Sequence, residues 1–61
     1  MQTPVGYWVA LGDNGWQTFH WTDEQTWPTT DDTGYTALAG PYEREDAQDR
    51  AKSLNVIFGY R

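Results

Sequence analysis

The side chains that could perform chemistry in this sequence are few. There is one histidine, His20, one serine, Ser53, and no cysteine. A transition-metal site needs several His or Cys ligands, and nucleophilic catalysis needs an activated hydroxyl or thiol beside a base. His20 falls in an expected strand and Ser53 in the last turn of an expected helix, so neither has the setting of a catalytic group. The sequence therefore favours a protein that is not an enzyme and that uses no cofactor.

Acidic side chains gather around a single tryptophan in the middle of the chain. Asp23, Glu24, Asp31 and Asp32 flank Trp27 in a Thr-rich stretch, residues 22–33, that has no periodic pattern. These acids lack the alternating spacing and the glycine of a calcium loop. Two roles stay open for Trp27, because it either packs back over the open end of the core or protrudes as an interface anchor ringed by acids.

The charge of the chain also bears on its partner. Of the formal net charge of −5, residues 1–42 contribute five acids and no base, whereas residues 43–61 contain four of each. Direct nucleic-acid binding requires clustered Lys and Arg, which this distribution does not provide. We expect instead a larger protein with a basic surface, reached by electrostatic steering.

The sequence gives no reason to expect a membrane partner. No apolar run approaches the ~20 residues that a membrane-crossing helix needs. The first four residues, Met1 to Pro4, lack the basic and hydrophobic regions of a signal peptide. The expected location is therefore the cytoplasm.

The elements that must position these residues indicate one α+β domain over positions 1–61. Residues 6–11 alternate as a strand, Asn14-Gly15 is a strong hairpin signal, and residues 16–21 form the returning strand. A third strand is expected at 34–39, ended by Gly40-Pro41, followed by a helix at 43–54. The predicted fold is thus a three-stranded antiparallel sheet, made of the hairpin 6–21 and the strand 34–39, packed on one C-terminal helix.

The helix is predicted from its stripe of small residues. Ala47, Ala51 and Leu54 lie at i, i+4 and i+7, so they share one face and would let the helix lie close to the sheet. Asn55 is a candidate cap for its C-terminus. The apolar run 56–60 allows two outcomes, a short fourth strand or a continuation of the helix, and its β-branched pair favours extended chain.

Alternation along the hairpin assigns its aromatic residues to two faces. The side expected to meet the helix carries Tyr7, Val9, Leu11, Phe19 and Trp21, and the opposite side carries Trp8, Trp16 and His20. One helix covers only one face of such a sheet. Trp8 and Trp16 would therefore form an exposed aromatic patch, unless the C-terminal tail folds over them, and they follow Trp27 as candidate protein-binding residues.

Two families resemble parts of this chain. The segment Asp23-Glu24-Gln25-Thr26-Trp27-Pro28, the following Gly34-Tyr35 and the helix make residues 23–54 similar to MbtH-like proteins, which are small acidic partners of adenylation domains in nonribosomal peptide synthesis. This resemblance implies that Trp27 lines a partner-binding pocket. The order of hairpin, third strand and helix also resembles the three-strand-plus-helix DNA-binding modules of integrases, whose basic sheet residues have no counterpart in residues 1–42.

These observations predict a small acidic protein-binding module that docks on a larger protein and modulates it, of the kind that bacteriophages use as regulators or inhibitors of host proteins. Two alternatives stay open. One is an acidic mimic of nucleic acid that blocks a DNA- or RNA-binding channel. The other is an MbtH-like accessory chaperone of an adenylation domain. The predicted contact residues are Trp27, Trp8 and Trp16 with the loop acids Asp23, Glu24, Asp31 and Asp32.

Overall fold

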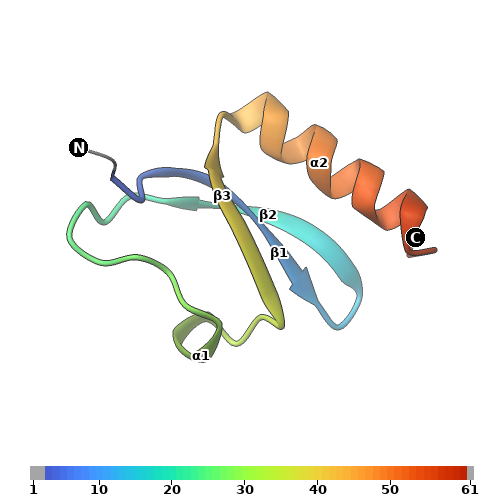
Figure 1. Cartoon of the computed structure of the whole chain (residues 1–61), viewed down its shortest axis with the longest axis horizontal. Helices are drawn as coiled ribbons and strands as arrows, with labels where there is room; N and C mark the ends of the chain where they lie inside the picture. The colour runs from blue at the N-terminus through green and yellow to red at the C-terminus, as the bar shows by residue number, and fades with distance from the viewer. Residues whose placement is uncertain (1–2, 61) are drawn as a thin grey trace.

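The computed structural model describes residues 3–60 and contains a sheet with one long helix packed on it (Figure 1). The elements follow in the order β1 (Gly6–Gly12), β2 (Gly15–Trp21), α1 (Thr30–Thr33), β3 (Ala37–Tyr42) and α2 (Arg44–Ile57). The strands are arranged β2-β1-β3, and both pairs are antiparallel. The predicted three-stranded α+β fold is confirmed.

The first hairpin turns through the two residues Asp13 and Asn14, because Gly12 pairs directly with Gly15. Gly15 has a φ of 116°, a conformation that favours glycine. A Cβ atom at this position would also lie 2.8 Å from the Asn55 side chain and 2.9 Å from the Cβ of Tyr60. Glycine is therefore needed here both for the turn and for the close approach of the C-terminal segment.

The register of this hairpin corrects the predicted faces of β2. Tyr7 pairs with His20 and Leu11 pairs with Trp16, and directly opposed residues in an antiparallel pair lie on the same face. Since Tyr7 and Val9 face α2, Trp16 and His20 lie on the helix side too. The remaining aromatic residues of β2, Phe19 and Trp21, share the opposite face with Trp8. The prediction placed Phe19 and Trp21 on the helix side and Trp16 and His20 on the opposite side. It was wrong for β2 because a two-residue turn pairs odd positions of β1 with even positions of β2.

The helix side of the sheet has a core of small side chains. Val9, Ala47 and Ala51 are buried in contact with one another, as the predicted stripe requires, and Leu54 packs against them partly buried. Tyr42, just before the helix, also packs on this cluster. Helix α2 lies mainly over β1 and β2 and makes little contact with β3. The tight packing is therefore concentrated over two of the three strands.

The helix is longer at its C-terminal end than predicted. It continues to Ile57, and the Phe58 N–H donates to the carbonyl oxygen of Leu54, so residues 56–60 do not form a fourth strand. Asn55 is not a cap, because its side chain accepts a hydrogen bond from the Trp16 N–H at 2.7 Å and donates to the Trp16 carbonyl at 3.0 Å. This long-range contact holds the last turns in helical form against the strand preference of Val56 and Ile57.

The third strand begins and ends later than predicted. It covers Ala37–Tyr42 instead of residues 34–39, and Gly40-Pro41 lies inside the strand instead of ending it. Gly34 has a φ of 80° and serves as the C-terminal cap of α1, so the chain is not yet extended there. Pro41 is compatible with the strand because β3 is an edge strand and because its pairing with β1 is already irregular there, opposite the segment between Tyr7 and Val9.

The long connection between β2 and β3 lies on the side of the sheet opposite α2 (Figure 1). It contains a single short helix, α1, whose N-cap Thr29 accepts a hydrogen bond from the Asp32 N–H at 3.1 Å. This element was not predicted, since the Thr-rich stretch has no helical periodicity. The connection brings Trp27 against Trp8, whose side chain is only 6% exposed. It is this loop, and not the C-terminal tail, that covers Trp8.

Candidate protein-binding site

Trp27 seals part of the core and is exposed at the same time. Its ring meets that of Trp8 edge to face, with centroids 6.0 Å apart and an interplanar angle of 88°. The side chain is nevertheless 45% exposed, and the following Pro28 is buried. The loop is anchored nearby, because the Trp21 indole N–H donates to the Thr26 carbonyl at 2.7 Å. Trp27 therefore presents part of an aromatic ring to solvent from a loop with fixed contacts.

The four predicted loop acids are all exposed. The Asp23 carboxylate accepts a hydrogen bond from the Gln25 N–H at 2.8 Å, which shapes the start of the loop. Asp31 and Asp32 occupy the first turn of α1, where carboxylates interact favourably with the helix dipole. The loop thus carries Trp27 and the acids together, and only Asp23 among the four uses its side chain in a hydrogen bond within the described chain.

The other two predicted contact residues are separated by the sheet. Trp8 lies on the loop side and is almost fully buried, with its indole N–H donating to the Pro4 carbonyl at 2.8 Å. Trp16 lies on the helix side, partly buried, with its ring centroid 6.4 Å from that of Phe58. The two rings do not form a shared exposed patch. In this conformation Trp8 stabilises the fold and has almost no surface to offer a partner.

A larger apolar surface lies at the C-terminal end of α2. Val56, Ile57 and Phe58 are 74%, 72% and 63% exposed, and Tyr60 beside them is also exposed. We call these four residues the terminal patch. Apart from Asn55, which bonds to Trp16, the last turn of the helix is apolar both on its inward side, at Leu54, and on its exposed sides, a pattern that normally marks a helix covered on more than one side. Sequence reasoning considered this run only as a strand or a helix extension, although an apolar turn ending a polar helix is itself a binding signal.

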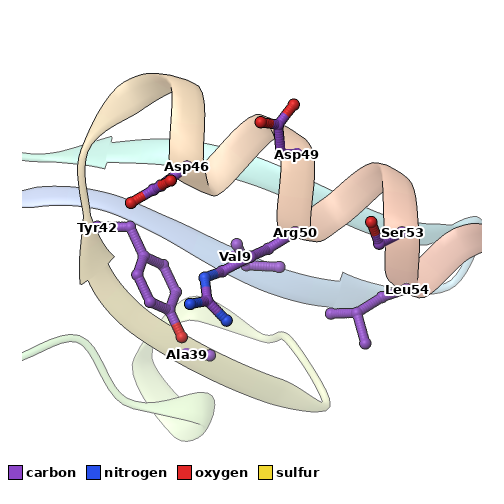
Figure 2. Close-up of a pocket in the computed structure, with 8 residues that line it drawn as sticks. All are labelled: Val9, Ala39, Tyr42, Asp46, Asp49, Arg50, Ser53 and Leu54. Atoms are coloured by element: carbon purple, nitrogen blue, oxygen red, sulfur yellow. The ribbon is translucent and has the colours of Figure 1, made fainter.

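A groove of about 390 Å³ opens between α2 and β3, where the helix does not cover the sheet (Figure 2). Its lining residues come from three elements and comprise Val9, Ala39, Tyr42, Asp46, Asp49, Arg50, Ser53 and Leu54. The Arg50 guanidinium lies 4.4 Å from the centroid of the Tyr42 ring, a cation–π contact that places this positive charge at one end of the groove. The groove was not predicted from the sequence.

Aromatic rings also line the sheet face opposite the helix. Phe19 stacks on Tyr35 at 5.7 Å with an interplanar angle of 9°, and it meets Trp21 edge to face at 6.4 Å. The Gln17 side-chain amide donates to the Tyr35 hydroxyl and holds that ring in place. All three rings are partly buried. This row continues the aromatic layer begun by Trp8 and Trp27.

The residues first considered for chemistry lie in unremarkable positions. His20 is exposed and stacks on Tyr7, with ring centroids 4.5 Å apart. Ser53 lies at the rim of the groove on α2. Within residues 3–60, no group of three or more His, Cys, Asp or Glu side chains is arranged to hold a metal ion. Neither helix in this range combines the length and apolar character of a membrane-crossing segment.

Comparisons with known proteins do not assign this chain to a family. No protein-family model matches the sequence. No curated protein and no solved structure matches it either. The resemblances to MbtH-like proteins and to integrase modules therefore stay predictions, and the interaction surfaces must be interpreted from their own physical chemistry.

Proposed function

We propose that this chain is a small acidic, non-enzymatic module that binds a larger protein and modulates its activity. The observation that carries this proposal is the terminal patch, in which three consecutive large apolar side chains are more than 60% exposed. Contiguous exposed apolar surface lowers solubility, and in a soluble protein it is most often an interaction site. A partner with an apolar cleft would bury these side chains.

The charge of the chain favours a partner with a basic surface. With a formal net charge of −5, the module would be drawn toward a positively charged partner before the apolar contacts form. Small size and acidity suit a regulator or inhibitor of a host protein of the bacteriophage type. The absence of Cys fits the reducing cytoplasm as the compartment in which it acts.

A second candidate function rests on Trp27. Its ring is 45% exposed in a loop rich in acids. The resemblance to MbtH-like proteins implies that this Trp enters the contact with a partner enzyme. An accessory chaperone role would therefore use the loop side of the sheet, whereas the terminal patch would not be needed.

Capture from a host lysate with matched variants separates these functions. Ile57→Gln removes an apolar side chain from the patch but keeps helix-compatible chemistry, and Lys52→Gln is the control at another exposed position of α2. We expect Ile57→Gln to melt within a few degrees of the parent and to lose a specific partner that Lys52→Gln retains, measured by quantitative mass spectrometry. Loss of the partner with Trp27→Ala alone would instead favour the accessory role. Identical captured proteins for all variants would contradict both.

A further inference from the structure

The two edges of the sheet differ in whether outward backbone groups have a hydrogen-bond partner. At the β2 edge, the Asn55 side chain takes both backbone groups of Trp16, with hydrogen bonds of 2.7 and 3.0 Å. These two bonds are the pair that a residue of a neighbouring strand would make. At the β3 edge, no strand follows within residues 3–60, since the order is β2-β1-β3. The β2 edge is thus capped at Trp16, whereas no such cap is found along β3 within residues 3–60, so the β3 edge can accept another strand.

The first half of β3 also lacks the usual protection of an edge strand. Edge strands are commonly blocked by proline, charged side chains or bulges. Here Pro41 and the irregular register opposite Tyr7 and Val9 affect only the second half of the strand. The segment Ala37-Leu38-Ala39 has small or apolar side chains and no charge. Its backbone can therefore be approached closely by an extended chain.

The groove beside β3 supplies pockets for the side chains of such a strand. Figure 2 shows Ala39 of β3 below the groove, α2 above it, and Val9 behind. Tyr42 and Leu54 lie at its two ends. Successive side chains of a strand point to opposite faces, so alternate residues of an added strand would point into this space. Recognition by strand addition combines main-chain hydrogen bonds with pockets for alternate side chains in this way.

The charges around the groove indicate the chemistry of the occupant. Asp46 and Asp49 are exposed on α2 along the groove, and the one cation among the lining residues, Arg50, is placed against the Tyr42 ring. A peptide with Lys or Arg would complement these carboxylates. A second copy of this chain has the same net charge of −5, and repulsion between two such chains disfavours pairing of two β3 strands.

We propose that β3 and α2 form a groove for an extended segment of a partner protein in which small aliphatic residues alternate with Lys or Arg. The segment adds to β3 as a fourth strand, with its aliphatic side chains between Ala39 and Leu54 and its cations near Asp46 and Asp49. This surface is distinct from both the terminal patch and the Trp27 loop, so it goes beyond the proposed function and stands without it.

A peptide titration of the whole ¹⁵N-labelled chain tests the main-chain part of the proposal. The probe is an eight-residue peptide that alternates Val and Lys, compared with one that alternates Val and Glu, and with a Val-Lys peptide that has Pro at its two central positions. We expect saturable amide shifts at Ala37, Leu38 and Ala39 with the first peptide only. The Pro peptide should bind roughly tenfold or more weakly, because it cannot donate its central hydrogen bonds. Equal binding of the Pro peptide would overturn strand addition.

Two charge reversals on the same helix test the side-chain part. Asp49→Lys changes a groove residue, and Glu45→Lys makes the same charge change at an exposed position that does not line the groove. We expect Asp49→Lys to weaken binding of the Val-Lys peptide roughly tenfold and Glu45→Lys to weaken it much less. Both variants should remain folded. Equal losses of affinity in the two variants would show only general electrostatic attraction and would overturn the proposed site. Shifts confined to Trp27 or to the terminal patch would also overturn it, as would dimerisation through β3 without peptide.

Discussion

The two faces of the sheet are covered by different means. On the helix side, Val9, Ala47 and Ala51 pack closely, and the helix backbone approaches the sheet because the side chains between them are small. On the loop side, aromatic rings form a layer that an irregular connection covers. The helix side therefore has little tolerance for added volume. The loop side depends on large rings and on hydrogen bonds from indole N–H groups to backbone carbonyls, of Pro4 for Trp8 and of Thr26 for Trp21.

The largest expected effect comes from a substitution in the packed core on the helix side of the sheet. Ala51→Arg places a long charged side chain where a buried methyl group now contacts the core, and it leaves that charge without a buried partner. We expect a loss of at least ~4 kcal/mol, which a domain of this size cannot sustain, so the variant should be unfolded by far-ultraviolet circular dichroism. Gln48→Arg, at an exposed position of the same helix, should melt close to the parent. Similar melting of the two variants would show that the stripe is wrongly placed.

A smaller effect is expected from the polar link between α2 and the hairpin. Asn55→Ala removes two hydrogen bonds and leaves the backbone N–H and C=O of Trp16 without these partners. We expect a loss of about 1 to 3 kcal/mol in the free energy of unfolding, measured by urea denaturation. Gln48→Ala serves as the control, since it removes an amide from an exposed position of the same helix. An equal, small effect of both substitutions would mean that the link contributes nothing to stability.

The smallest expected effect compares the two faces of the sheet directly, because the same substitution, Trp to Phe, is made on each face. Trp8→Phe removes an indole N–H that is paired with the Pro4 carbonyl, whereas the buried indole N–H of Trp16 has no acceptor among residues 3–60. We therefore expect Trp8→Phe to cost about 1 kcal/mol more than Trp16→Phe in chemical denaturation. If Trp16→Phe costs as much or more, the loop-side hydrogen bond does not have the value assigned to it.

Local patterns in the sequence predicted the parts of the fold that local patterns determine. The Ala47 and Ala51 stripe and the hairpin around Asn14 were identified because each is specified within a few residues. The faces of β2 were missed because they depend on the number of residues in the turn, and one residue more or fewer moves every side chain of the returning strand to the other face. The extension of α2 was one of two open outcomes and the less favoured one, because local propensity does not include the contact between Asn55 and Trp16, 39 residues apart.

The candidate sites were predicted less well than the fold, for a similar reason. The exposure of Trp27 was one of two open alternatives, since no periodicity places a loop residue. The burial of Trp8 requires knowledge of the path of the loop across the sheet. The groove exists because α2 lies over β1 and β2 more than over β3, which is a property of helix placement and not of any short motif.

The two hydrogen bonds between Asn55 and Trp16 form late in the synthesis of the chain. The hairpin of β1 and β2 leaves the ribosome first, but Asn55, which pairs the outward backbone groups of Trp16, comes 39 positions later. Until that residue arrives, the nascent chain has an unpaired strand edge beside exposed aromatic rings, a state that is prone to association with other chains. The β2 edge at Trp16 therefore stays open until synthesis has passed Asn55.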